Sequence, residues 1–249
     1  GTNMVVANAS SHSDLFWALK GGGGGAFGVV VALTLKVYKA PPSMTSLSCA
    51  WPLSKGGARV GESILAEWHG KIMPSLPNEW TFYTMGMRTP LGPSVPKFNY
   101  RTMNGLLIVE GLYNAPADQA MHDSVEMLMN LGKEHQLKCD FTNFSSFKSW
   151  HDQSWFASEG PVAFRTYMAS SFAQPDFDAA AHAKLVTDTV TQLPLNAINM
   201  MFGVQLGGAV SKPQGGAAQT SVSTNFRTAV MMQENDSGKC TVACLCVCV

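Results

Sequence analysis

A run of glycines near the amino end is the part of this sequence whose residue types and spacing most suggest chemistry. Residues 23–28 read Gly-Gly-Gly-Ala-Phe-Gly and satisfy G-x-G-x-x-G, the pattern that cradles a pyrophosphate in dinucleotide-binding proteins. That function needs a strand before the glycines and a helix after them, so that the helix amino end faces the phosphates. Here the predicted order is reversed, because a short helix over 11–21 precedes the run and a strand over 29–38 follows it. The sequence therefore predicts no Rossmann fingerprint, and without a following Lys-Ser or Lys-Thr it predicts no P-loop.

Two interpretations of the glycine run remain open from the residues alone. In the first, the run is only a structural turn from helix to strand, within a non-catalytic α+β binding module. In the second, the bare backbone lets a flat or phosphate-bearing cofactor approach closely, because glycine has no side chain and tolerates positive φ. Five consecutive glycines, residues 21–25, exceed what a turn needs.

Cysteines and histidines are weaker candidates for chemistry. Four of the six cysteines lie in the last ten residues with the spacing C-x3-C-x-C-x-C, which could bind Cu(I) or Zn²⁺ but also fits an anomalous chain end. Cys49 and Cys139 are isolated, and we expect ordinary thiols there. The six histidines contain no helical i, i+4 pair, so we predict no metal site and expect surface or packing roles. His151, between Trp150 and Trp155, could line a substrate pocket.

Composition and charge exclude several classes of protein. Lys plus Arg and Asp plus Glu are both 17, so the balanced charge offers no footprint for a phosphate backbone and we expect no nucleic-acid partner. No apolar run reaches the length of a transmembrane helix, so we expect no membrane partner. Charged residues make up only 14%, against roughly 25% in an average soluble domain. Part of the surface is therefore expected to be covered by a cofactor, a partner or a missing segment.

Apolar periodicity predicts an α+β fold in which helices back a sheet. Besides the strand over 29–38, we predict strands over 45–51, 80–88, 105–113, 161–172, 197–206 and 225–233. We predict further helices over 57–72, 116–131 and 176–193, with Gly132 stopping the second and a proline-rich loop over 89–98. The inward face of the last helix is expected to contain Ala181, Leu185, Val186, Val190 and Leu193. Pro41-Pro42 marks a domain boundary.

The segment Asp14-Leu-Phe-Trp-Ala-Leu-Lys-Gly-Gly-Gly-Gly-Gly-Ala-Phe-Gly-Val-Val30 resembles a signature of berberine bridge enzyme-like FAD-linked oxidases. These proteins share the FAD-binding fold of vanillyl-alcohol oxidase and p-cresol methylhydroxylase, the PCMH type. Residues 207–210, Asn225-Phe-Arg227 and Met231-Met-Gln233 resemble the family less specifically. The resemblance covers most of residues 4–235.

The resemblance implies a domain layout and a cofactor. Residues 1–42 would be the carboxyl-terminal edge of a PCMH-type FAD-binding domain. Residues 43–235 would form an antiparallel-sheet substrate domain backed by helices, and residues 236–249 an anomalous cysteine-rich tail. By position, the resemblance implies that the backbone near the FAD is contributed by Gly24, Gly25, Gly28, Val29 and Val30.

The implied activity is oxidation of a small organic substrate, with hydride passing to flavin N5 and electrons to oxygen. The family's upstream flavin loop and its carboxyl-terminal motif have no counterpart in this sequence, so no catalytic residue is carried over. We expect a fragment that alone binds FAD weakly or not at all, and a secreted full-length parent, although this chain has no signal peptide of its own. Three glycosylation sequons begin at Asn8, Asn143 and Asn235, close to the number that chance gives, so they do not decide the compartment.

Overall fold

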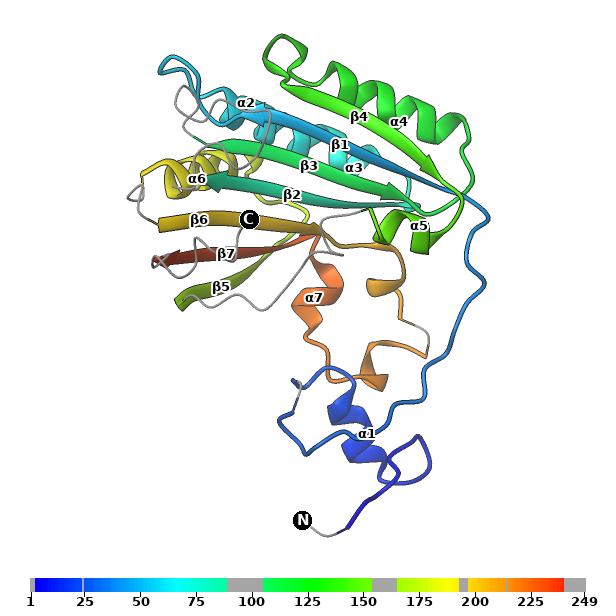
Figure 1. Ribbon diagram of the computed structural model, residues 1–249. Coiled ribbons are helices and arrows are strands. Elements are labelled where there is room, and N and C mark those ends of the chain that lie inside the picture. The colour runs from blue at the N-terminus through cyan, green and yellow to red at the C-terminus, as the bar shows by residue number, and fades with distance from the viewer. Residues whose placement is uncertain are drawn as a thin grey trace.

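The computed structural model describes residues 3–23, 25–88, 105–153, 165–192, 197–213 and 215–239. Within them the chain forms the expected α+β fold around one seven-stranded sheet with the order β4-β1-β3-β2-β6-β7-β5 (Figure 1). All neighbouring strands are antiparallel. The strands are β1 (Met44–Pro52), β2 (Trp80–Arg88), β3 (Leu106–Tyr113), β4 (Lys138–Phe144), β5 (Arg165–Ala173), β6 (Ala197–Gln205) and β7 (Met231–Lys239).

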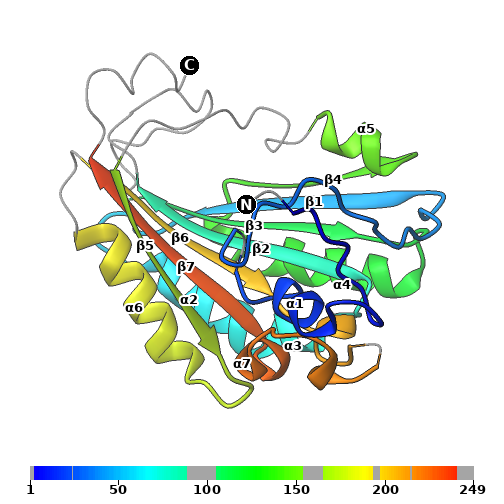
Figure 2. The same ribbon diagram turned by 90° about the horizontal axis from the view of Figure 1, so that it is seen from below.

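Helices cover one face of this sheet and leave the other largely open. The longer helices α2 (Val60–Glu67), α4 (Gln119–Asn130) and α6 (Ala179–Gln192) lie on the covered face (Figures 1 and 2). The shorter elements are α1 (Ser13–Leu19), α3 (Met73–Ser75), α5 (Phe147–His151), α7 (Thr224–Thr228), the π-helix η1 (Trp68–Ile72) and the 3₁₀ turns η3 (Lys133–His135), η5 (Gly208–Val210) and η6 (Ala217–Gln219).

Strand alternation builds the core between the sheet and the helices. Leu47, Cys49 and Trp51 occupy alternate positions of β1 and are fully buried in it. Two core tryptophans also satisfy their polar atoms, since Trp51 Nε1 donates to the Leu131 carbonyl at 3.0 Å and Trp68 Nε1 donates to Thr84 Oγ1 at 2.8 Å. Burial of each such large side chain contributes roughly 2–3 kcal/mol.

The ends of α4 follow from local chemistry. Asp118 caps the helix by accepting a hydrogen bond from the Met121 amide at 2.8 Å, so the helix starts later than the expected Pro116. Gly132 follows the helix with φ +50°, which confirms it as the stop. A Cβ atom at this glycine would also lie 2.7 Å from Ile64.

Several predicted boundaries were wrong in detail. The helix expected over 57–72 is α2 continued by η1 and α3, so it passes Pro74. The strand expected from 225 begins at Met231, because residues 224–228 form the helix α7, which the Ser223 side chain caps. On α6 the exposed fraction of Leu185 is 59%, so its inward assignment was wrong. The buried positions of α6 are Ala183, Val186, Thr187 and Val190.

The predicted strand over 29–38 is absent from this structure. These residues have no regular secondary structure, and Val29, Leu33 and Val37 are 90%, 75% and 85% exposed. Alternation in a sequence indicates the two faces of a strand but not its hydrogen-bonding partner, and no described strand lies beside this segment.

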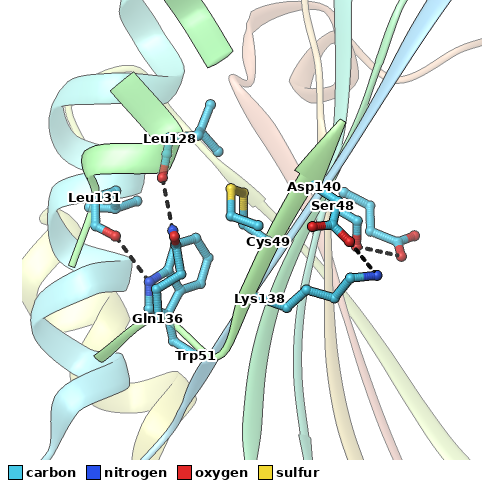
Figure 3. The surroundings of a disulfide bond; sticks show 10 residues. Ser48, Cys49, Trp51, Leu128, Leu131, Gln136, Lys138 and Asp140 are labelled. Carbon is cyan, nitrogen blue, oxygen red and sulfur yellow. Dashed lines mark hydrogen bonds and ion pairs between the residues drawn. A yellow bond between two sulfur atoms is a disulfide. The ribbon is translucent and has the colours of Figure 1, made fainter. Parts of the chain in front are cut away.

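The two isolated cysteines are not free thiols. Cys49 on β1 lies directly opposite Cys139 on β4 and forms a disulfide with it (Figure 3). Strand β4 is a polar edge strand that apolar periodicity does not predict, so the pairing of two cysteines 90 residues apart could not be predicted. The proline-rich loop over 89–98 and residues 240–249 of the tail lie outside the described residues, while β7 continues through Lys239.

Candidate functional site

The open face of the sheet contains a hollow of about 550 Å³ over β1, β2 and β3. Its floor is formed by strand side chains on the face opposite α2, α4 and α6. The short helix α5 contributes one wall. The hollow is lined by Met44, Ser46, Thr81, Tyr83, Glu110, Gly111, Leu112, Asn114, Phe144, Phe147, Trp150 and Gln153. Aromatic rings with a few polar groups are the usual lining of small-molecule sites.

Glu110 provides the charge in this hollow. It lies on β3, opposite Ser48 of β1 on one side and Tyr83 of β2 on the other. Ser48 Oγ donates to Glu110 Oε1 at 3.4 Å. Among the described residues that line the hollow, Glu110 alone is charged. A carboxylate so placed can accept a hydrogen bond or a proton from a bound molecule.

Helix α5 supplies the aromatic wall. The Ser146 side chain caps it and forms a reciprocal capping box with Ser149, which fixes where the helix begins. Phe147 and Trp150 then follow three residues apart, with ring centroids separated by 5.2 Å. His151, the predicted pocket residue, is not among the lining residues that the structure describes, although Trp150 and Gln153 on either side of it are. Trp155 lies outside the described residues.

The glycine segment belongs to a separate part of the molecule, where α1 packs against the chain before β7. Trp17 Nε1 donates to the Ala218 carbonyl at 2.9 Å, and Ser221 Oγ donates to the Ala18 carbonyl at 2.9 Å. Arg227 supports this loop, with Nη1 donating to the Val210 carbonyl at 2.8 Å. The structure thus brings α1, from the segment with the strongest family resemblance, beside residues 218–221. These lie between the weaker resemblance segments 207–210 and 225–227, about 200 residues further along the chain.

The predicted cofactor residues form an open stretch of backbone beside α1. Gly25 and Gly28 have φ of +74° and +148°, and a Cβ atom at either would meet nothing within 4 Å. Val29 and Val30 are 90% and 49% exposed, and Gly24 lies outside the described residues. Such a bare, apolar backbone fits close approach by a flat group. None of these described residues lines the hollow on the sheet.

A buried histidine pair lies on the helix-covered side of the sheet. His69 on η1 is 2% exposed, and its ring centroid lies 5.1 Å from that of His182 on α6. Burial, helped by the nearby His182, lowers the pKa of His69 to about 3. Burial also lowers the pKa of His182, although a hydrogen bond with Gln233 of β7 opposes the shift. Both rings are therefore uncharged at neutral pH, and they pack against each other, with His69 buried and His182 partly buried.

The described residues contain neither a metal-ligand cluster nor a membrane-spanning helix. They contain no cluster of three or more His, Cys, Asp or Glu side chains arranged to hold a metal ion. Over the same ranges, no helix combines the length and apolar character that crossing a membrane requires.

The fold is similar to part of the fold of solved VAO-type flavoproteins. A VAO-type flavoprotein from Myceliophthora thermophila superimposes with a TM-score of 0.74 at 20% identity, covering 94% of this chain and 41% of that protein. A BBE-like protein from Arabidopsis thaliana superimposes with a TM-score of 0.61 at 18% identity, covering 91% and 43%. No protein-family model matches the chain.

The sequence is related to fungal FAD-linked oxidoreductases. It is 26% identical over 248 residues to FAD-linked oxidoreductase easE of Trichophyton verrucosum, covering 91% of this chain and 36% of that protein. A shorter stretch of 46 residues is 56% identical to an uncharacterized FAD-linked oxidoreductase of Arthroderma benhamiae. The predicted resemblance is therefore confirmed by homologues whose names specify FAD, and the chain spans well under half the length of these relatives.

Proposed function

We propose that this chain forms part of a FAD-dependent oxidase of a small organic substrate. The observation that carries the proposal is the hollow on the open sheet face, where one carboxylate lies among aromatic side chains on a VAO-type fold. Residues 1–42 would be the edge of the FAD-binding domain and residues 43–235 the substrate domain. The Cys49–Cys139 disulfide supports the further proposal that the parent enzyme is secreted, because disulfides persist in oxidising compartments.

Two parts of the chain would contribute to the reaction, one by holding the cofactor and the other by binding the substrate. When bound, FAD supplies the hydride acceptor and passes electrons to oxygen. The backbone at Gly25, Gly28 and Val29 would hold its adenosine and pyrophosphate half, together with Gly24 and Val30. In the hollow, Glu110 would orient a substrate hydroxyl or amine and accept its proton, while Phe147 and Trp150 would pack on the substrate and exclude water.

The test of the substrate site uses the complete enzyme that contains this chain. Replacing Glu110 with Gln keeps the shape of the hollow but removes the charge, and we expect flavin reduction by substrate to slow by roughly 100-fold or more. Anaerobic stopped-flow absorbance measures that rate, and the flavin content should stay unchanged. Glu126→Gln, on the exposed face of α4, is the matched control. An unaltered reduction rate in E110Q would refute the role of this residue.

A second substitution tests the glycine segment. We expect Gly28→Val to abolish flavin retention while the fold persists, because a side chain at φ +148° would occupy the space of the cofactor. Flavin absorbance after gel filtration and circular dichroism measure the two properties. Unchanged flavin content would support the alternative in which the run is a structural turn of a non-catalytic module, which the FAD-linked homologues do not favour.

A further inference from the structure

One sequon lies at the exposed edge of the sheet, close to the disulfide. Asn143, Phe144 and Ser145 form the sequon N-x-S at the end of β4, which is an edge strand. Asn143 and Ser145 are both exposed. By contrast, the sequon asparagine Asn235 lies on β7, which is hydrogen-bonded to neighbours on both sides. The edge position gives Asn143 room for a bulky modification that an interior strand lacks.

The amide of Asn143 is held in a definite orientation. Thr45 Oγ1, on the adjacent strand β1, donates to Asn143 Oδ1 at 2.7 Å. The oxygen therefore faces the sheet, and the other branch of the amide, Nδ2, is left for solvent. Since Nδ2 is the atom that carries an N-linked sugar, attachment there leaves the hydrogen bond to Thr45 intact.

An exposed aromatic ring lies beside this asparagine. Phe141 precedes Asn143 by two residues on β4, so both side chains project from the same face of the strand. The ring is 45% exposed although it is apolar. The first sugar of an N-glycan presents a row of C–H groups, and stacking it on Phe141 would remove apolar surface from water.

The disulfide is an independent indication of the same compartment. Cys139 lies on the same strand four residues before Asn143, and its bond to Cys49 joins β4 to β1. Disulfides form in the endoplasmic reticulum lumen, where N-glycans are also added. The disulfide thus favours the compartment in which the sequon on the same strand could be used.

We propose that Asn143 is an N-glycosylation site whose first N-acetylglucosamine packs on Phe141 and shields the edge of β4. In the transfer, Nδ2 of Asn143 bonds to C1 of the oligosaccharide while the bond from C1 to the diphosphate of a lipid carrier breaks. The amide gives up one proton and the lipid diphosphate leaves. The glycan would also protect an edge strand whose free hydrogen-bonding groups invite aggregation.

Occupancy is tested by secreting the 249-residue chain from yeast and analysing its peptides by mass spectrometry. We expect a hexosamine-bearing peptide that contains Asn143, and we expect it to disappear in Ser145→Ala. Asn130→Gln, an exposed asparagine outside any sequon, is the control and should retain the glycan. A peptide with unmodified Asn143, from chain in the medium or retained in the lumen, would overturn the proposal.

The contact with Phe141 has its own test. One endoglycosidase leaves a single N-acetylglucosamine on Asn143, and an amidase removes the sugar entirely. We expect the single-sugar form to melt roughly 2 °C or more above the sugar-free form in the wild type, a difference that Phe141→Ala should abolish. An equal difference in both proteins would show that the sugar does not pack on the ring.

Discussion

The buried histidine pair makes the stability of this chain sensitive to mild acid. His69 is 2% exposed and its pKa is lowered to about 3, chiefly by burial. In the unfolded chain the same ring titrates near its ordinary value of 6.5. Between these two values the unfolded state therefore binds more protons than the folded state. Stability contributed by the neutral ring is complete above pH 6.5 and is lost progressively as the pH falls toward 3.

The size of the effect follows from the two pKa values. Each pH unit below the unfolded pKa costs about 1.4 kcal/mol until the folded pKa is reached. Lowering the pH from 7 to 5 should therefore reduce the free energy of unfolding by about 2 kcal/mol through His69 alone. His182, whose pKa is also lowered by burial, adds to the loss in the same direction.

Urea titrations at pH 7 and pH 5 measure this loss, and His69→Phe isolates it. The variant keeps a ring in the pocket beside Phe177 but removes both buried ring nitrogens that have no hydrogen-bond partner among the described residues. We expect the pH-dependent loss to be about 2 kcal/mol smaller in H69F than in the wild type. His122→Ala, at an exposed position of α4, should leave the loss unchanged. Equal losses in H69F and wild type would refute the reasoning.

Two further predictions concern stability. Cys139→Ser opens a loop of 90 residues, so the unfolded chain gains entropy and we expect the free energy of unfolding in urea titrations to fall by roughly 4–5 kcal/mol. The wild type treated with reductant should match the variant. A wild type whose stability does not change with reductant would contradict the presence of the disulfide. Gly132→Ala places a Cβ atom 2.7 Å from Ile64 at φ +50° and should cost about 2 kcal/mol. Gly57→Ala, at φ +87° with nothing within 4 Å, is the control for backbone strain, and equal costs would show that contact with Ile64 is unimportant.

What the sequence predicted well was local. The strands over 80–88 and 105–113 emerge within a residue of their expected bounds, because their side chains alternate between a buried and an open face. Gly132 was identified because a left-handed stop after a helix needs glycine. The extended resemblance around the glycine run identified the flavoprotein relatives, which periodicity alone could not have done.

What the sequence could not predict depends on register between distant strands. Glu110 on β3 was missed because the neighbours that make it notable, Ser48 and Tyr83, come from two other strands. The Cys49–Cys139 bond needs the pairing of β1 with β4, whose polar sequence gives little sign of a strand. Each residue is ordinary by itself, and only the folded sheet makes it part of a site.

In the exposed segment over 29–38, the sequence shows a local pattern but not the partner that the pattern would need. Its apolar residues alternate as a strand requires, yet Val29, Leu33 and Val37 face solvent. A free energy of roughly 25 cal/mol per Å² disfavours leaving such surface in water, so a sequence that maintains this pattern is suited to a partner sheet. That is what the proposed edge of an FAD-binding domain requires, since the relatives are more than twice as long as the part this chain matches. The low charge of the chain, 14%, fits the same proposal, because surface that another part of the enzyme would cover has no need of charged side chains.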